Sequence, residues 1–177
     1  MTGAVWASTQ NKHGAPGFCT QSGDALFKLY RTTGNVLYAD LLRDIVHAHA
    51  EGVQPNGRIT ERLTYCDADS RGSRGDGGWT GWTETNGALM ALEIPGIYVR
   101  TDLGKAYTFD HVTVEEIKKV GNDTRMVLHN PTEFDATVTI FSENEEQAKK
   151  PLGDNAFLDW KQKVTVKAGK RTTVKIK

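Results

Sequence analysis

The chain has 177 residues, of which 22 are basic and 22 acidic, so its formal net charge at neutral pH is zero. This balance argues against a general electrostatic attraction to nucleic acid or to an anionic membrane, and we expect neither as a partner. Hydrophobic residues make up 38% of the chain and charged residues 25%, which is typical of a globular protein with a core. No apolar run approaches the ~20 residues of a membrane helix.

The start of the chain, MTGAVWASTQNKHG, lacks the charged beginning and apolar middle of a secretory signal. Localisation therefore stays open: periplasmic or secreted if the parent protein carries a signal peptide, and cytoplasmic otherwise. The two cysteines, Cys19 and Cys66, fit either a disulfide or two buried thiols. There is no Cys-x-x-Cys pair, phosphate-binding loop or complete dinucleotide fingerprint, so no cofactor is expected.

Helical patterns dominate the sequence before residue 96. Residues 24–33, DALFKLYRTT, predict a helix with Ser22 as its N-cap and Gly34-Asn35 as its stop. A third helix is expected at about 83–93. Between these two, residues 36–50 show the clearest helical period, with a predicted apolar face of Leu37, Tyr38, Leu41, Leu42, Ile45 and Val46.

After Pro95 the pattern changes to period two, which is typical of strands. The alternation slips before Ile117, which predicts a bulge. The turn at Asn130-Pro-Thr-Glu133 predicts a hairpin between the strands on either side of it, and Gly169-Lys170 predicts a second hairpin at the end of the chain. Short strands are expected at 97–102, 106–110, 111–120, 124–129, 135–141, 163–168 and 171–177.

Taken together, these patterns predict an α+β protein. A helical segment over residues 1–95 precedes an antiparallel β-sandwich over residues 96–177, because many short strands separated by turn signals favour that architecture. The polar connection 142–156 is expected to contain one helical turn. The inward residues of the sandwich are expected to include Ala136, Val138, Ile140, Val164, Val166, Val174 and Ile176.

Two stretches resemble a known family. ALFKLYRTTGNVLYADLLRDIV (25–46) resembles one helical hairpin of the six-hairpin, or (α/α)6 toroid, glycosidase-like proteins, in which Leu-Tyr-x-x-Thr-Gly-x-x-x-Tyr often joins an inner helix to an outer one. Here Leu29-Tyr30-Arg31-Thr32-Thr33-Gly34 is followed by Tyr38. The segments HNPTEFDATVTIF and KVTVKAGKRTTVKIK resemble the C-terminal β-sandwich of several carbohydrate-active enzymes in that group.

A toroid needs six hairpins, whereas this chain offers about one and a half. The resemblance therefore implies the C-terminal portion of such a protein, with a partial toroid in residues 1–95. It also implies that apolar helix faces pair either with another copy, as a homo-oligomer, or with the missing N-terminal toroid. The expected partner in function is an oligo- or polysaccharide.

The irregular segment 61–87 holds most of the groups that could act on a sugar. Glycoside hydrolysis uses two carboxyl groups, one protonated and one ionised, and the catalytic candidates are Asp67, Asp76 and Glu84. Asp76 lies between two glycines, which allows a ligand to approach closely. Glu84 begins the third predicted helix, where a carboxylate is also favoured without any catalytic role. Acids beside arginines are equally typical of surface ion pairs.

The same segment holds the substrate-binding candidates. Trp79 and Trp82 could stack on sugar rings or simply pack in the interior. A lyase would use Tyr65 or a histidine as base, and Arg71 or Arg74 to neutralise a uronate. A hydrolase would use two of the three acids.

No metal site is predicted. Asp67-Ala-Asp-Ser-Arg-Gly72 begins like an EF-hand loop, but its fifth position is Arg71, and Gly78 stands where a glutamate is required. His47 and His49 are two residues apart on a helix, so they point to different sides and cannot share a metal. Near the end of that helix, either histidine is expected as a cation favoured by the helix dipole.

The sequence thus predicts a carbohydrate-processing protein that resembles the C-terminal part of a glycoside hydrolase or polysaccharide lyase, with residues 61–87 contributing to a sugar cleft. The alternative is a non-catalytic carbohydrate-binding or structural interaction module. In that alternative, the acids of the segment pair with arginines and its tryptophan rings are buried.

Overall fold

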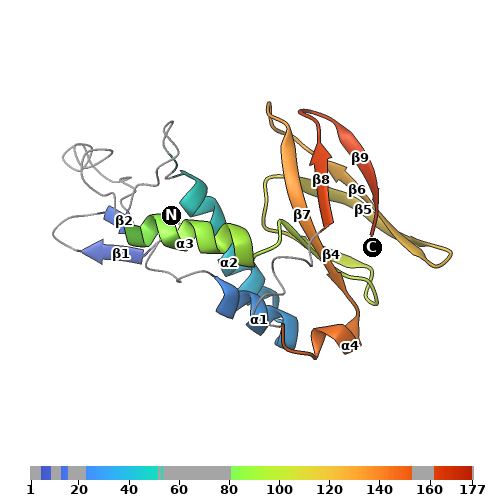
Figure 1. The fold of residues 1–177 in the computed structure, drawn as a ribbon, viewed down its shortest axis with the longest axis horizontal. Coiled ribbons are helices and arrows are strands. Elements are labelled where there is room, and N and C mark those ends of the chain that lie inside the picture. Colours follow the sequence, from blue (N-terminus) through green and yellow to red (C-terminus); the bar gives the residue numbers. More distant parts are fainter. Residues whose placement is uncertain are drawn as a thin grey trace. The chain divides into compact units, whose positions relative to one another are not determined.

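The computed structural model describes residues 5–8, 13–15, 23–51, 53, 81–152 and 162–176. Over these residues the chain is a mixed α+β protein, as the sequence predicts (Figure 1). By the contacts between its residues the chain divides into two compact units. The first comprises Met1–Tyr30 and Gly34–Glu93, and the second comprises Arg31–Thr33 and Ile94–Lys177.

The first unit contains the helices that the sequence predicts, together with a small antiparallel pair of strands. The strands are β1 (Val5–Ser8) and β2 (His13–Ala15). None of the helices that the structure describes is long and apolar enough to cross a membrane. The helices are α1 (Asp24–Thr33), whose last turn belongs to the second unit, α2 (Val36–Glu51) and α3 (Gly81–Glu93).

The sequence predicts the C-terminal end of α1 correctly but not its N-cap. Gly34 ends the helix as predicted, with a left-handed φ of 68° and an N–H that donates to the Tyr30 carbonyl at 2.8 Å. The predicted cap at Ser22 is wrong, because the N-cap is Gly23, with φ 78° and no capping side chain. Asp24 in the first turn supplies the favourable negative charge instead, and it also pairs with Lys28 at 2.7 Å.

Helix α2 buries a different stripe from the one predicted. Leu42 and Ile45 are fully buried, as expected, but Leu37 and Leu41 are 64% and 40% exposed. The buried stripe runs at three-residue intervals through small and apolar side chains. The predicted face is therefore rotated toward the solvent side. The buried apolar residues of α2 are Ala39, Leu42, Ile45 and Ala48.

The second unit consists of two sheets. The strands of the four-stranded sheet lie in the order β4-β3-β7-β8, and those of the three-stranded sheet in the order β5-β6-β9. A short helix, α4 (Glu145–Ala148), follows β7 at the predicted place. The strands are β3 (Ile97–Arg100), β4 (Lys105–Thr108), β5 (Thr113–Val120), β6 (Asp123–His129), β7 (Ala136–Glu143), β8 (Gln162–Val166) and β9 (Arg171–Lys175).

The sheets are not antiparallel throughout. Strands β3 and β7 run parallel, with Ile97 opposite Ile140 and Arg100 opposite Glu143. The other pairs in both sheets are antiparallel. The predicted purely antiparallel sheet is therefore wrong at this one pair. Parallel strands cannot be joined by a tight turn, so this pair forms between segments far apart in the sequence.

Both predicted hairpins are also wrong. The turn after Asn130 connects β6 to β7, but β6 lies in the three-stranded sheet and β7 in the four-stranded sheet. The turn at Gly169 likewise connects β8, which pairs with β7, to β9, which pairs with β6. Each turn carries the chain from one sheet to the other, and local turn signals do not distinguish such a crossing from a hairpin.

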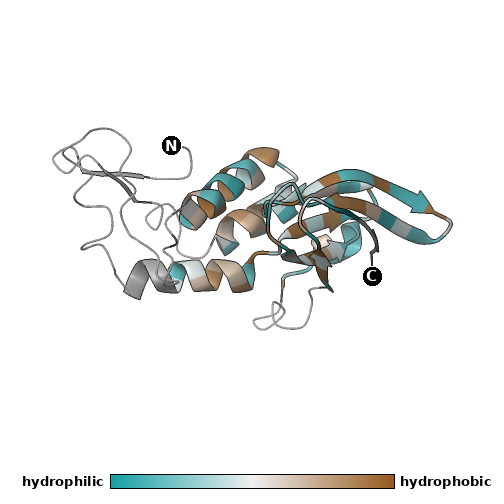
Figure 2. Cartoon of the chain, turned by 90° about the horizontal axis from the view of Figure 1, so that it is seen from above, coloured by the Kyte–Doolittle hydropathy of each residue, from teal (hydrophilic) through white to brown (hydrophobic). Residues whose placement is uncertain are grey.

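The core of the second unit draws side chains from both sheets. Alternate residues of the strands point inward, which gives the strands of this unit alternating teal and brown bands in Figure 2. The predicted inward residues are confirmed, with Ala136 and Val164 packed at its margin. The buried core residues are Ile97, Val99, Val112, Met126, Leu128, Val138, Ile140, Val166, Val174 and Ile176.

The predicted slip in β5 is confirmed as a bulge. The register between β5 and β6 shifts between Val114 and Glu116, so that Glu115 is the extra residue. Beyond the bulge Ile117 lies opposite Met126 and faces the core, while Lys118 lies opposite Arg125 on the other face. The bulge therefore keeps the apolar residues on both sides of it directed inward.

Candidate functional site

Most of the predicted site residues lie outside the part of the chain that the structure describes. Trp82 and Glu84 lie in the first turn of α3. Their roles, and the sugar cleft over residues 61–87, stay predictions. The site candidates outside the described residues are Tyr65, Asp67, Arg71, Arg74, Asp76 and Trp79.

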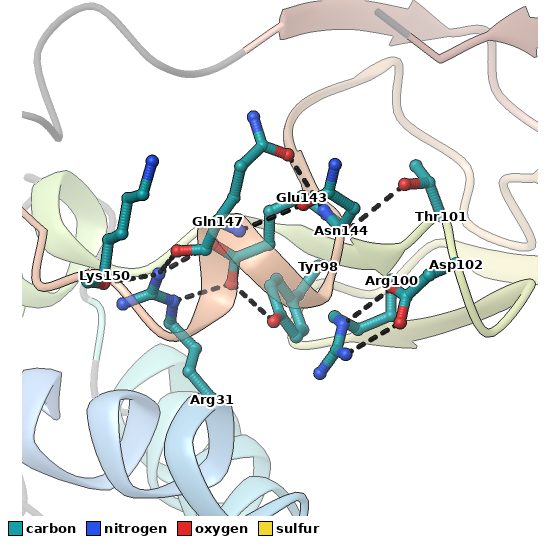
Figure 3. Close-up of polar contacts among 9 residues, drawn as sticks. All are labelled: Arg31, Tyr98, Arg100, Thr101, Asp102, Glu143, Asn144, Gln147 and Lys150. Carbon is teal, nitrogen blue, oxygen red and sulfur yellow. Dashed lines mark hydrogen bonds and ion pairs between the residues drawn. The ribbon is translucent and has the colours of Figure 1, made fainter.

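The described residues bring together a different polar cluster, centred on Glu143 at the end of β7 (Figure 3). Arg31 donates two hydrogen bonds to this carboxylate, from Nε to Oε1 at 2.7 Å and from Nη2 to Oε2 at 2.6 Å. The hydroxyl of Tyr98 donates to Oε1 at 2.5 Å. This is a two-point Arg–carboxylate pair, the strongest common form of ion pair. No sequence pattern predicted that any of these three residues would form such a pair.

Strand alternation explains why these side chains meet. In the parallel pair, Tyr98 and Arg100 on β3 lie opposite Phe141 and Glu143 on β7. All four therefore point to the face of the four-stranded sheet away from the core that the two sheets share. Arg31, in the last turn of α1, reaches the same face, with its guanidinium 5.8 Å from the centre of the Phe141 ring. This contact is within cation–π distance.

Arg31 also approaches the end of α4. Its Nη2 donates at 3.4 Å to the carbonyl oxygens of Gln147 and Lys150. The Gln147 carbonyl also accepts the N–H of Lys150, at 3.0 Å. At the other end of this helix, Asn144 and Gln147 form a capping box. A single guanidinium therefore contacts the end of β7, the end of α4 and an aromatic ring.

The electrostatics of the cluster favour a fixed arrangement. Burial raises the pKa of Tyr98 well above its usual range, and the hydrogen bond to Glu143 raises it further. The phenol therefore stays protonated at neutral pH and can donate to Glu143. Close by, the hydrogen bond from Arg100 lowers the pKa of Asp102.

The cluster is closed to solvent. The side chains of Arg31 and Glu143 are only 4% and 2% exposed, and Tyr98 is buried as well. A general acid or base must come within hydrogen-bond distance of its substrate, which this burial prevents. The cluster therefore connects Arg31 with the ends of β7 and α4 within the second unit and does not act on a substrate.

A second feature is exposed: the loop between β6 and β7 presents the ring of Phe134, which is 77% exposed. Asn130, which is fully buried, donates through its Nδ2 to the Phe134 carbonyl at 2.7 Å and to the Val166 carbonyl at 3.0 Å. Its Oδ1 accepts from the N–H and the hydroxyl of Thr132 at 3.0 and 2.8 Å. The backbone that carries the ring is therefore held by one fully used amide side chain.

The turn between β8 and β9 supports this loop from the side. Asp135 pairs with Lys167 at 2.6 Å and accepts the N–H of Ala168 at 3.0 Å. The N–H of Gly169 donates to the Thr132 carbonyl at 3.1 Å. The turn at 130–133 was predicted from the sequence, but the role of the phenylalanine that follows it was not. The available signal was an aromatic residue directly after a Pro-containing turn.

Carboxylates near the surface of the second unit are engaged by neighbouring cations. Glu115 accepts two hydrogen bonds from Arg171, at 2.7 and 2.8 Å. No group of three or more metal-ligating side chains occurs within the described ranges. The other paired acids are Asp102 with Arg100, Glu116 with Lys118, Asp123 with Lys175, Asp135 with Lys167, and Glu145 and Glu146 with Lys149.

His49, one of the two histidines of α2, does not behave as predicted. His49 is 4% exposed, and neither of its ring nitrogens has a hydrogen-bond partner within the described part of the chain. Burial lowers its pKa. The expectation of a cationic His49 at the helix end is therefore wrong, because the cost of burying the charge outweighs the attraction of the helix dipole.

Comparisons of the chain with models of protein families, with curated proteins and with solved structures found no match.

Proposed function

We propose that this chain belongs to a carbohydrate-processing protein and that its second unit binds carbohydrate without cleaving it. The resemblance of residues 25–46 to a six-hairpin segment, and of the strands after residue 97 to a C-terminal sandwich, supports the first part of this proposal. The finer architecture proposed with it is a partial α/α toroid followed by a β-sandwich that contains one parallel strand pair.

The exposed ring of Phe134 is the observation that carries the binding role. Leaving a phenylalanine in water forgoes roughly 1.5–3 kcal/mol of burial free energy. The hydrogen bonds of Asn130 and Thr132 hold the backbone under the ring. The loop would therefore lose little conformational entropy when a ligand binds. The C–H face of a sugar ring can stack on such an aromatic surface.

The paired acids favour binding over cleavage in this unit. Hydrolysis of a glycosidic bond needs two carboxyl groups that flank the scissile bond, one of them protonated and the other ionised. Here Asp102, Glu115 and Asp135 accept hydrogen bonds from basic side chains, which lower the pKa of each. A pKa shift in that direction is the opposite of what a general acid requires. Any catalytic role of Asp67, Asp76 or Glu84 stays a separate prediction.

The test is a glycan array probed with the wild-type chain and with Phe134→Ala. We expect the wild type to retain neutral or acidic glycans, and the variant to bind them about tenfold more weakly. Leu103→Ala is the matched control. It removes another exposed apolar side chain, 56% exposed, from the turn after β3. Because β3 and β7 run parallel, that turn lies at the opposite end of the sheet from the Phe134 loop.

Two results would overturn the proposed binding role. One is unchanged binding by Phe134→Ala, and the other is the absence of any bound glycan. A reducing-sugar assay on the same glycans separates binding from chemistry. Sugar release that Asp76→Ala abolishes would place catalysis in residues 61–87, and release that persists in this variant would contradict the assignment of Asp76.

A further inference from the structure

The outer face of the three-stranded sheet carries a row of basic side chains. Met126 and Val174 lie opposite each other and are buried in the core. Their neighbours Arg125 and Lys175 therefore point to the outer face, because successive residues of a strand alternate in direction. Lys118, next to the inward-facing Ile117, points to this outer face as well.

The register aligns the three cations. Lys118 on β5 lies opposite Arg125 on β6, and Arg125 lies opposite Lys175 on β9. Figure 1 shows these strands, with β6 in the middle of the sheet. Adjacent strands are about 4.8 Å apart, so the row extends about 10 Å across the sheet. Like charges directly opposite each other destabilise a sheet, so this row is not explained by folding.

Local carboxylates neutralise only the two ends of the row. Lys118 pairs with Glu116 at 3.1 Å, and Lys175 pairs with Asp123 at 2.9 Å. Both pairs are exposed, and such pairs are weak enough for a ligand to replace them. The guanidinium of Arg125 has no hydrogen-bond or ion-pair partner among the residues that the structure describes.

The next basic row on this face is different. His129 on β6 lies opposite Arg171 on β9. The bulged residue, Glu115, serves both of them: it accepts two hydrogen bonds from Arg171 and lies 3.6 Å from His129. The chain therefore supplies a shared carboxylate to one basic row and none to the central cation of the other.

We propose that this outer face binds an acidic polysaccharide, whose carboxylates are received by the row of Lys118, Arg125 and Lys175. The inference rests on the proposed carbohydrate-binding function and specifies its ligand as anionic. A guanidinium presents paired donors that match a carboxylate, and a linear polyuronate carries carboxylates repeatedly along its length. A straight row of cations is complementary to such a chain.

The composition of this face favours a polysaccharide over a nucleic acid. Single-stranded nucleic acids bind through aromatic side chains on which the bases stack. Strands β5, β6 and β9 contain no phenylalanine, tyrosine or tryptophan.

The test measures binding of a polygalacturonate fragment to the full chain by titration calorimetry. The triple variant Lys118→Gln, Arg125→Gln, Lys175→Gln keeps the side-chain lengths and removes the charges. We expect it to bind about tenfold or more weakly than the wild type. Wild-type binding should itself fall about tenfold between about 50 and about 200 mM salt. Thermal unfolding should show that the variant is folded, with a midpoint no lower than that of the wild type.

The matched control variant removes the same net charge elsewhere, at β4 and α4: Lys105→Gln, Lys149→Gln, Lys150→Gln. It should bind as the wild type does. Fully methyl-esterified polygalacturonate, which has the same backbone without the charges, should bind much more weakly than the acid form. Equal binding by the row variant and the wild type would overturn the inference, as would equal binding of the esterified polymer. Equally tight binding of a single-stranded oligonucleotide would also overturn it, in favour of a general polyanion surface.

The failure of this inference can be told from the failure of the proposed function. If Phe134→Ala loses glycan binding while the row variant keeps it, the chain binds carbohydrate and the anionic site is wrong. If no saccharide of either charge binds, both are wrong.

Discussion

Arg31 and Glu143 are 112 residues apart in the chain, yet they form a buried ion pair with two hydrogen bonds of 2.7 and 2.6 Å. Both side chains are almost completely removed from water. The Tyr98 hydroxyl and two carbonyl groups at the end of α4 complete the surroundings of this pair. Burying two charges costs several kcal/mol for each ion, and this cost is offset only where the geometry is good and further hydrogen bonds are made. Here the carboxylate accepts two hydrogen bonds from Arg31 and one from Tyr98.

Removing one member of the pair should therefore destabilise the second unit strongly. Glu143→Leu leaves the Arg31 guanidinium buried without its carboxylate, and we expect a loss of about 3–5 kcal/mol in the free energy of unfolding. Urea denaturation measures this change. The double variant Arg31→Met, Glu143→Leu removes both charges and should recover most of the loss. A single variant within about 1 kcal/mol of the wild type would contradict the assignment of this pair.

The hydroxyl of Tyr98 should contribute less than the ion pair does. Tyr98→Phe removes one hydrogen bond to the carboxylate while both bonds from Arg31 remain, so we expect a loss of about 1.5 kcal/mol. The same denaturation experiment measures it. Tyr38→Phe is the control, because the Tyr38 hydroxyl has no hydrogen-bond partner among the described residues. A similar loss in the two variants would show that the Tyr98 hydrogen bond is not the cause.

His49 should make stability depend on pH. Its pKa in the folded state is lowered by burial from the ordinary value of 6.5, so the unfolded chain takes up the proton first as the pH falls. The stability contributed by the neutral ring is present above pH 6.5. It is lost at up to about 1.4 kcal/mol per pH unit as the pH falls from 6.5 toward the lowered pKa.

Unfolding of the wild type and of His49→Leu at about pH 7.5 and about pH 5.5 tests this dependence. The leucine variant should lose less stability between the two conditions than the wild type does. An equal loss in both proteins would assign the pH dependence to other groups.

Arg125 should be replaceable with a gain in stability. Arg125→Glu places a carboxylate between Lys118 and Lys175, which converts two repulsive cross-strand pairs into attractive ones. We expect a gain of about 0.5–1 kcal/mol, together with the loss of acidic-glycan binding. Thermal unfolding at low salt and at about 1 M salt checks the cause, because salt should remove most of the gain. A destabilised variant would mean that Arg125 has a structural role.

Local order in this protein is predictable where neighbouring residues decide it. Gly34 ends α1 because glycine readily adopts the left-handed conformation that is needed at this position. The slip before Ile117 predicts the bulge because the alternation of side chains is visible along a single strand. The prediction of the N-cap of α1 was wrong. Serine is a typical capping residue, so Ser22 was expected to be the N-cap, but the helix begins after Gly23. The buried stripe of α2 could not be chosen locally, because Leu37 and Leu42 are equally apolar.

The candidate sites lie further from what a single sequence reveals. Nothing near Arg31 or Glu143 in the chain marks them as partners, and Arg125 is unusual only because of the residues opposite it on neighbouring strands. Phe134 was the one candidate that its sequence context could have identified. The acids and tryptophans of residues 61–87 stay predictions.

The sequence by itself determined the α+β class, the positions of the strands after residue 96 and the sides of β7, β8 and β9 that face the core, because periodicity and turn residues are local properties. The pair β1 and β2 was not predicted. Only the tertiary structure decided which strands pair. The turns at Asn130 and Gly169 reverse the chain in either arrangement, and the burial of a common apolar core directs the strand that follows each turn into the other sheet. In this pairing β3 lies beside β7, so that Tyr98 contacts Glu143. The pairing of β5, β6 and β9 aligns the basic row.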